Sequence, residues 1–266
     1  MEGICRDLLT ECEALAVLAG SLTEGQWGMK TPFYDWTPWD EIAHLCLFDM
    51  TGLMAVEDPE AFRRDAAGIL EKMAAGRDLA DFHRERFQGV GGPEILARWR
   101  DNNRRLVAAL AGRGPKDRLP WYGPPMSALS FATARLMETW AHGQDIYDAL
   151  GLRRAPTNRL RHIAHLGVTT FRWSFMNRGL PVPPREPYVE LAAPDGDTWR
   201  WGEPSGEEWI RGQAEDFCLV VTQRRHAADT SLAHGGEGTA AWLKIAQCFA
   251  GPPADGPAPG ERKTSP

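Results

Sequence analysis

Cysteine is scarce in this sequence, and long apolar runs are missing from it. The five cysteines among the 266 residues are odd in number and form no Cys-x-x-Cys pair, so the sequence indicates neither a disulfide framework nor a thiolate zinc site. No stretch of about 18 apolar residues occurs, and the N-terminal stretch carries charges where a signal peptide would be continuously apolar. We therefore expect a cytoplasmic protein that has no membrane partner.

A strongly basic stretch is missing as well. The formal net charge is -6, the sequence pI is about 5.7, and no dense run of Lys and Arg occurs, which argues against a nucleic-acid-binding surface. The 43% hydrophobic and 25% charged residues are ordinary for a soluble globular protein of one large or two small domains. Tryptophan is abundant, at 11 residues, which indicates a well-filled core or an aromatic-lined pocket.

The N-terminal part of the chain has the apolar spacing of helices. Thr37 is a predicted N-cap, Pro38 occupies the first helical position, and Asp40 stands where a capping box places an acid. Gly76 is expected to break the charged third segment in two. The predicted helical segments are Ile4–Leu22, Pro38–Val56, Pro59–Phe87, Pro93–Leu110 and Ser127–Leu150. They suffice for a four-helix bundle of about 150 residues.

After Gly151, a predicted helix C-cap, the sequence changes in character. Polar and apolar residues alternate on both sides of an Asp-Gly pair at 195 and 196, which is typical of a β-hairpin. Further helices are predicted over Arg159–Phe175, Ala214–Thr222 and Gly238–Cys248, with a strand near Thr230–Leu232. The tail from Gly251 is rich in Pro and Gly and is predicted to be mobile.

These elements predict a mixed fold of α and α/β parts. We expect a helical bundle over residues 1–155, a small α+β domain over residues 156–250, and a disordered tail over residues 251–266.

The helix predicted over Ser127–Leu150 has two stripes of interest. The apolar residues at 129, 132, 136, 140 and 143 recur at helical spacing and should face the bundle. A second stripe carries Arg135, Glu138, His142 and Asp145. Glu138 and His142 are one turn apart on the same face, so their oxygen and nitrogen atoms can converge on a divalent metal such as zinc. The same spacing also occurs in ordinary solvated or hydrogen-bonded pairs.

A third candidate lies on the second predicted helix. His44 is flanked by apolar residues and should point into or along a packed face, where it is either a core residue or a metal ligand. Asp40 lies one turn before His44 and could orient its imidazole. The histidines at 83, 226 and 234 stand in charged or loop contexts and are predicted to be on the surface.

The motifs WTPWDEIAHL and METWAHGQD carry a resemblance to a known family. Together they resemble the DinB-like metalloprotein superfamily, and within it the actinobacterial branch related to mycothiol-dependent maleylpyruvate isomerase. The C-terminal half, with DFCLVVTQRRHAADT, is similar to the small sterol-carrier-protein-like domain of that branch. The resemblance implies that His44, Glu138 and His142 hold a divalent metal, usually zinc. If so, the imidazoles of His44 and His142 must lie within roughly 8 Å of each other.

The resemblance implies an activity that uses the open fourth position of such a site. The first hypothesis is a metal-dependent enzyme that activates the small thiol mycothiol for attack on an electrophilic small molecule, as a transferase or isomerase. The second is a thiol-independent lyase, hydrolase or cyclase acting on a biosynthetic intermediate. The third is a non-catalytic protein that binds a metal or ligand. A monomer or a homodimer is compatible with each.

Four further residues are candidates for roles around the site. Asp145 could orient His142, or could be an exposed carboxylate. Arg224, as a catalytic group, and Arg225, as a cofactor-binding group, could bind a carboxylate through their guanidinium forks, or could be solvated residues after a helix end. His165 is a weaker candidate near the presumed domain boundary.

Overall fold

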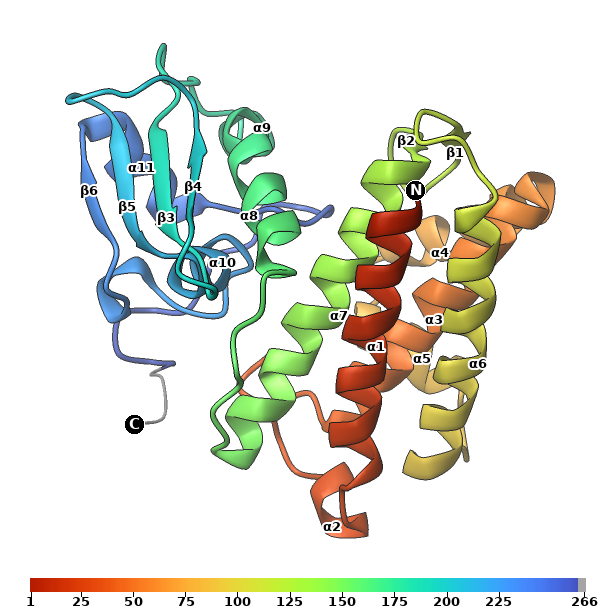
Figure 1. Ribbon diagram of the computed structural model, residues 1–266. Helices are drawn as coiled ribbons and strands as arrows, with labels where there is room; N and C mark the ends of the chain where they lie inside the picture. Colours follow the sequence, from red (N-terminus) through yellow and green to blue (C-terminus); the bar gives the residue numbers. More distant parts are fainter. Residues whose placement is uncertain (263–266) are drawn as a thin grey trace. The chain divides into compact units, whose positions relative to one another are not determined.

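The computed structural model describes residues 1–262 and divides the chain into two compact units (Figure 1). The first unit ends at Leu150 and the second begins at Gly151, whereas the sequence placed the boundary after residue 155. Gly151 has a φ of 64°, the left-handed conformation that commonly ends a helix and that glycine adopts without steric cost. The division therefore coincides with the end of the last bundle helix.

The first unit is a four-helix bundle, as predicted (Figure 1). Its long helices are α1 (Glu2–Gly20), α3 (Pro38–Glu57), α6 (Gly92–Ala111) and α7 (Ala128–Leu150). Two further helices, α4 (Pro59–Ala74) and α5 (Leu79–Arg86), pack on α3. The remaining elements are short: α2 (Glu24–Trp27), β1 (Arg118–Leu119) and β2 (Met126–Ser127). The predicted break in the third segment is confirmed, since α4 and α5 are separate and Gly76 between them has a φ of 83°.

Helix α3 begins with the predicted capping box. The Thr37 hydroxyl accepts a hydrogen bond from the Asp40 backbone N–H at 3.2 Å, and Asp40 Oδ2 accepts one from the Thr37 N–H at 2.9 Å. These bonds satisfy backbone donors that a helix leaves free at its start. The first turn of α3, which carries two carboxylates, is therefore fixed in place.

The buried face of α7 differs in one position from the predicted stripe. Leu129 is 45% exposed, while Ala128 and Phe131 are buried. At its first turn the buried face of α7 therefore passes through its neighbours Ala128 and Phe131, and Leu129 falls outside it. The stripe from Ala132 onward is buried as expected.

A buried ion pair joins α3 to α7 inside the bundle. The Nε of Arg135 donates to Asp49 Oδ1 at 2.8 Å, and both side chains are almost fully buried. Asp49 Oδ2 accepts further hydrogen bonds from Trp99 Nε1 at 2.9 Å and Asn103 Nδ2 at 3.2 Å, both on α6. Because a buried charge is stable only when it is paired and hydrogen-bonded, this network fixes the register of three helices.

The second unit is a small α+β structure, so the predicted fold class is confirmed. Its sheet has the order β4-β3-β5-β6 (Figure 1). Its strands are β3 (Tyr188–Ala192), β4 (Thr198–Trp201), β5 (Trp209–Gln213) and β6 (Ala233–Gly235). Its helices are α8 (Leu160–Thr169), α9 (Phe171–Met176), α10 (Ala214–Val221) and α11 (Glu237–Ile245), with the 3-10 turn η1 (Ala227–Asp229). The predicted hairpin is β3–β4, in which Glu190 pairs with Arg200.

Three details of the second unit differ from the sequence-based expectations. The helix predicted over Arg159–Phe175 is broken at Thr170, whose hydroxyl bonds to the carbonyls of Leu166 and Gly167 and so competes with helical bonding. Strand β5 was not predicted, and it pairs in parallel with β3. The last strand, β6, starts one residue beyond the predicted segment Thr230–Leu232.

The predicted mobile tail is hydrogen-bonded to the rest of the second unit as far as Gly260. Gln223 Nε2 donates to the Ala254 carbonyl at 2.7 Å, and the Gly260 N–H donates to Asp229 Oδ2 at 2.8 Å. The expectation of a disordered tail over residues 251–266 stays a prediction, and these bonds connect residues 254 and 260 to the rest of the unit. The rest of the predicted tail, residues 263–266, lies outside the described residues.

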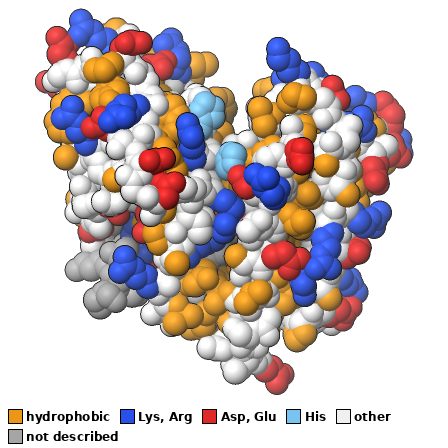
Figure 2. All heavy atoms as spheres, in the orientation of Figure 1, with side chains coloured by type: hydrophobic (Ala, Val, Ile, Leu, Met, Phe, Trp, Pro, Cys, Tyr) orange, Lys and Arg blue, Asp and Glu red, His pale blue; other side chains and the backbone are white. Residues whose placement is uncertain are grey.

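All five cysteines are free and buried, as the absence of a disulfide pattern indicated. Acidic and basic side chains are interspersed on the face seen in Figure 2. Among the helices of residues 1–262, none is both long enough and apolar enough to span a bilayer.

Candidate metal centre

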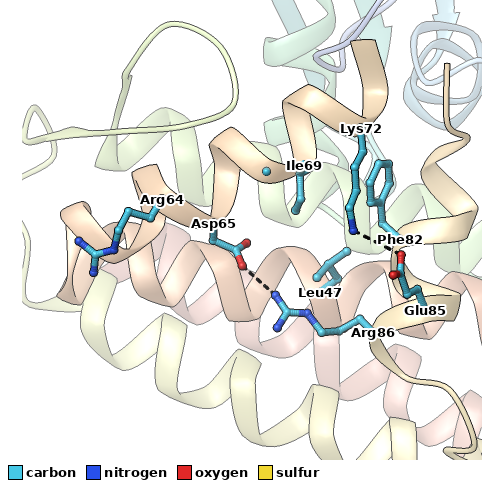
Figure 3. Close-up of a pocket in the computed structure, with 9 residues that line it drawn as sticks. Leu47, Arg64, Asp65, Ile69, Lys72, Phe82, Glu85 and Arg86 are labelled. Carbon is cyan, nitrogen blue, oxygen red and sulfur yellow. Dashed lines mark hydrogen bonds and ion pairs between the residues drawn. The ribbon is translucent and has the colours of Figure 1, made fainter. Parts of the chain in front are cut away.

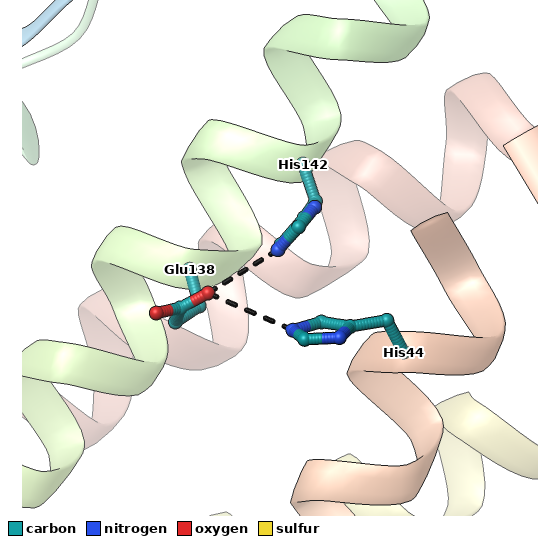
Figure 4. A group of neighbouring side chains, drawn as sticks. All are labelled: His44, Glu138 and His142. Atoms are coloured by element: carbon teal, nitrogen blue, oxygen red, sulfur yellow. Dashed lines mark ion pairs between the residues drawn. The ribbon is translucent and has the colours of Figure 1, made fainter. Parts of the chain in front are cut away.

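His44, Glu138 and His142 converge inside the first unit (Figure 4). Glu138 and His142 project from α7 toward His44 on the facing helix α3. Glu138 Oε2 lies 3.2 Å from His142 Nε2 and 3.8 Å from His44 Nε2. The two imidazole centroids are 4.4 Å apart, well inside the limit of roughly 8 Å that a shared ion requires.

The spacing of these three side chains fits a zinc-sized ion. In a tetrahedral site with bonds of about 2.0–2.1 Å, neighbouring ligand atoms lie about 3.3 Å apart. The two carboxylate–imidazole separations, 3.2 and 3.8 Å, bracket that value. The Glu138 side chain is 24% exposed, while both imidazoles are buried, so a ligand could approach the cluster from the carboxylate side.

Two of the donors are in the protonation state that a metal needs. Burial, together with the nearby His142, lowers the pKa of His44 to about 3, so its imidazole is neutral at pH 7. Burial raises the pKa of Glu138, but its interactions with the nearby His142 and His44 outweigh this effect and bring that pKa well below its ordinary value. A neutral imidazole and an ionised carboxylate are both competent ligands.

A second carboxylate, that of Glu41, contacts His142 at Nδ1, the ring nitrogen that does not face Glu138. Glu41 Oε2 lies 2.6 Å from His142 Nδ1, and its Oε1 accepts a hydrogen bond from Thr31 Oγ1 at 2.8 Å. Glu41 was not among the site residues predicted from the sequence. The predicted partner Asp145 is buried, which rules out an exposed carboxylate, but its Oδ2 is 4.0 Å from His142 Nδ1. That separation is too long for a hydrogen bond.

Asp40 does not orient His44, contrary to expectation, because it is engaged elsewhere. Asp40 Oδ1 lies 3.1 Å from His83 Nε2, and Arg84 donates to both Asp40 oxygens at 2.7 and 3.0 Å. Burial raises the pKa of Asp40, but the hydrogen bonds from His83 and Arg84 outweigh it and hold that pKa well below its ordinary value. The Nδ1 of His44 is buried and has no hydrogen-bond partner within the described chain.

The prediction that His83 lies on the surface is wrong. His83 is fully buried, and burial lowers its pKa despite the contact with Asp40. Its neighbours at 84–86 are charged, but α5 docks on α3 with His83 turned inward. The other two histidines called surface residues are more accessible: His234 is exposed, and His226 is partly exposed and accepts a bond from the Ala228 N–H.

Aromatic rings surround the imidazoles. The Trp36 ring centroid lies 5.3 Å from that of His44 and 5.9 Å from that of His142, with the latter pair nearly parallel. Phe33 lies against His142 at 5.4 Å, and Phe48 against His44 at 4.7 Å. These rings remove water from the walls of the site, which strengthens electrostatic interactions inside it.

Arg224 and Arg225 are buried, so the alternative of solvated residues is wrong. Arg224 Nη1 donates to the Thr222 carbonyl, and Arg225 Nη1 donates to the Arg224 carbonyl, both at 2.7 Å. His165 Nδ1 accepts a hydrogen bond from Trp201 Nε1 at 3.3 Å. The catalytic and cofactor-binding roles of the two arginines stay predictions.

A separate cavity of about 540 Å³ lies at α4 and α5, over α3 (Figure 3). Leu47 and Phe82 supply apolar lining. Its charged lining is largely paired, since Arg86 contacts Asp65 at 2.9 Å and Lys72 contacts Glu85 at 3.5 Å. The cavity shares no lining residue with the cluster of His44, Glu138 and His142.

Comparisons with known proteins relate this chain to one family. The family described as Mycothiol maleylpyruvate isomerase N-terminal domain matches residues 8–147. Two proteins of Mycobacterium tuberculosis, from strains CDC 1551 and H37Rv and both described as uncharacterized, are each 44% identical over 252 residues, covering 94% of this chain and 96% of theirs.

Two solved structures share the fold. A crystal structure of a mutant of the mycothiol-dependent maleylpyruvate isomerase aligns with a TM-score of 0.56 at 12% identity, over 87% of this chain and 92% of that one. A second structure of that isomerase aligns with a TM-score of 0.53 at 13% identity, over 84% and 89% of the two chains. At such low identity these alignments establish the fold alone.

Proposed function

Because the chain belongs to the family of the mycothiol maleylpyruvate isomerase N-terminal domain, we propose that it is a metal-dependent enzyme of the thiol-using type. In this proposal a divalent cation, zinc, is held by His44, Glu138 and His142. The co-substrate is the small thiol mycothiol, and the substrate is an electrophilic small molecule. The reaction is a thiol transfer or a thiol-assisted isomerisation.

One observation carries the proposal: three donors from two helices converge with the spacing of a zinc site, and the carboxylate is accessible. When bound there, such a cation lowers the pKa of a thiol or water that reaches it. Among residues 1–262 no fourth His, Cys, Asp or Glu joins this group. That composition is typical of catalytic rather than structural zinc sites and argues against a purely structural or storage role.

The surrounding residues support this chemistry. His44 supplies a neutral imidazole, and the Glu138 carboxylate balances part of the charge of the cation. Trp36 and Phe33 exclude bulk water from one side of His142, which limits competition between water and the thiol.

Arg224 and Arg225 belong to the second unit, and their proposed binding of a carboxylate of substrate or co-substrate is a separate part of the proposal.

A thiol-independent lyase, hydrolase or cyclase is the second candidate. It is favoured by the aromatic walls formed by Trp36, Phe33 and Phe48, which suit an apolar intermediate better than a polyhydroxylated thiol. Arg84, which follows the Trp36 contact residue His83 in the chain, is committed to Asp40 by two hydrogen bonds.

Turnover with and without thiol separates the two candidates. Zinc-loaded protein would be incubated with maleylpyruvate and with other electrophiles, in the presence and absence of mycothiol. We expect product only with mycothiol, and loss of product in a Glu138→Ala variant but not in Glu94→Ala, which removes an exposed carboxylate from α6. Product formed without thiol would favour the second candidate and contradict the first.

A further inference from the structure

We infer that Glu41 is the positioning residue of the candidate metal centre, because it fixes which nitrogen of His142 is free to bind the ion. The inference rests on the metal dependence in the proposed function and adds a residue to it. Glu41 would touch neither substrate nor metal. It would act through His142 alone.

The geometry holds the Glu41 carboxylate by both oxygens. Glu41 is fully buried in the first turns of α3, next to the capping box at Thr37. Its Oε1 accepts the Thr31 hydroxyl at 2.8 Å, and its Oε2 faces His142 Nδ1 at 2.6 Å. A carboxylate anchored at one oxygen presents the other in a fixed direction, so the imidazole opposite is held in one orientation.

The chemistry of imidazole makes this contact decisive. A carboxylate only accepts hydrogen bonds, so the nitrogen facing Glu41, Nδ1, must carry the proton. In the neutral ring the lone pair is then on Nε2, the atom 3.2 Å from Glu138 Oε2. In the opposite tautomer Nε2 would carry a hydrogen and could not bind a cation. Glu41 therefore sets His142 in the form that a metal requires.

No equivalent contact supports the other imidazole. His44 Nδ1 has no hydrogen-bond partner within residues 1–262, and Asp40, one turn before it, is engaged by His83 and Arg84. Asp145 is a competing candidate for His142, but its oxygen lies at 4.0 Å, against 2.6 Å for Glu41. The two histidines of the cluster are thus unequal: His142 is held by a carboxylate, and His44 is held by packing.

Zinc affinity tests the inference directly. The dissociation constant of the full chain for zinc would be measured by competition with a chelator, for the wild type and for Glu41→Gln. Glutamine keeps the volume of the side chain but removes its charge, and loss of such a supporting group typically weakens metal binding by about 10- to 100-fold. Thr31→Val, which frees Oε1 but leaves Glu41 in place, should give a smaller loss. Asp40→Asn is the matched control, since it alters the neighbouring carboxylate and should leave zinc affinity near the wild-type value.

The tautomer of His142 is a second quantity to measure, and a general loss of protein stability would not change it. In metal-free wild-type protein, nitrogen NMR of the histidine rings should show His142 protonated at Nδ1, and Glu41→Gln should lose that preference. Unchanged zinc affinity in Glu41→Gln would overturn the inference. So would a zinc affinity that is weakened by Asp145→Asn but not by Glu41→Gln. If the wild type binds no zinc, the proposed function fails, and the NMR result still decides the Glu41–His142 contact.

Discussion

The Asp40 carboxylate lies 3.1 Å from the His83 imidazole, and both side chains are buried at the junction of α3 and α5. Arg84 completes the group from the solvent side with two hydrogen bonds to Asp40. This arrangement fastens α5 to the first turn of α3, beside the imidazoles of the candidate metal centre.

Acid should destabilise the metal-free protein in two stages. The pKa values of His83 and His44 lie below the ordinary value of about 6.5, so the unfolded chain takes up protons first as the pH falls through that value. The pKa of Asp40 is also depressed, so its contribution is complete above about pH 3.9 and is lost as the pH falls further. Urea unfolding between pH 7 and pH 3 should show falling stability throughout.

One variant and one control test these contributions. Asp40→Asn should flatten the part of the profile below about pH 4, because the depressed carboxyl is gone. His234→Ala, which removes an exposed histidine from β6, should leave the profile unchanged. Equal stability at pH 7 and pH 4.5 would contradict the buried, neutral state of His83.

Metal content should depend on the carboxylate of the cluster. We expect purified wild-type protein to carry about one equivalent of zinc and Glu138→Ala to carry much less, because two imidazoles alone are a poor zinc site. Elemental analysis measures the content, and circular dichroism checks that the helices remain. Wild-type zinc content in Glu138→Ala would remove this residue from the ligand set.

Breaking the buried ion pair Asp49–Arg135 on one side should lower the stability of the protein strongly. Arg135→Met leaves the Asp49 charge buried, which typically costs about 3–5 kcal/mol, and the bonds from Trp99 and Asn103 should keep the loss near the lower end. Urea unfolding measures it. The double variant Asp49→Leu/Arg135→Met should recover part of the loss.

The control for that experiment is an exposed pair. Arg98→Met breaks the ion pair with Glu94 on the surface of α6 and should cost no more than about 1 kcal/mol. Similar losses in Arg135→Met and Arg98→Met would contradict a structural role for the buried network.

Two helical glycines should respond to alanine in opposite ways. A Cβ at Gly52 in α3 would lie 2.9 Å from Phe131 Cζ, and such overpacking costs about 1–3 kcal/mol. At Gly68 in α4 nothing lies within 4 Å of the added atom, so Gly68→Ala should stabilise the protein by up to about 1 kcal/mol. Thermal unfolding compares the two variants, and the same sign for both would show that packing does not decide the outcome.

Local patterns in the sequence predicted the parts of the site that lie on one helix. The four-residue spacing of Glu138 and His142 is a property of α7 alone, and the capping box of Thr37 and Asp40 is a property of the start of α3. The approach of His44 to that pair could be expected only through the family resemblance, since no local pattern relates residues so far apart in the chain.

The supporting contacts could not be read from the sequence for the same reason. Glu41 resembles any acidic residue in the first turn of a helix, where the helix dipole favours it, and its partner His142 is 101 positions away. The burial of His83 depends on how α5 docks, which the charged residues after it do not reveal. Strand β5 pairs in parallel with β3, while β4, which lies between them in the sequence, pairs on the other side of β3. This pairing is non-local, and the short sequence of β5 does not encode it.

Trp36 packs against three imidazoles, those of His44, His83 and His142, with ring centroids between 5.0 and 5.9 Å away. Because the excited state of an indole responds to charge beside its ring, the fluorescence of Trp36 is a built-in optical probe of this cluster. Subtracting the emission of a Trp36→Phe variant isolates its signal from the other tryptophans. The arrival of a cation could then be followed by light alone, in real time and without an added dye.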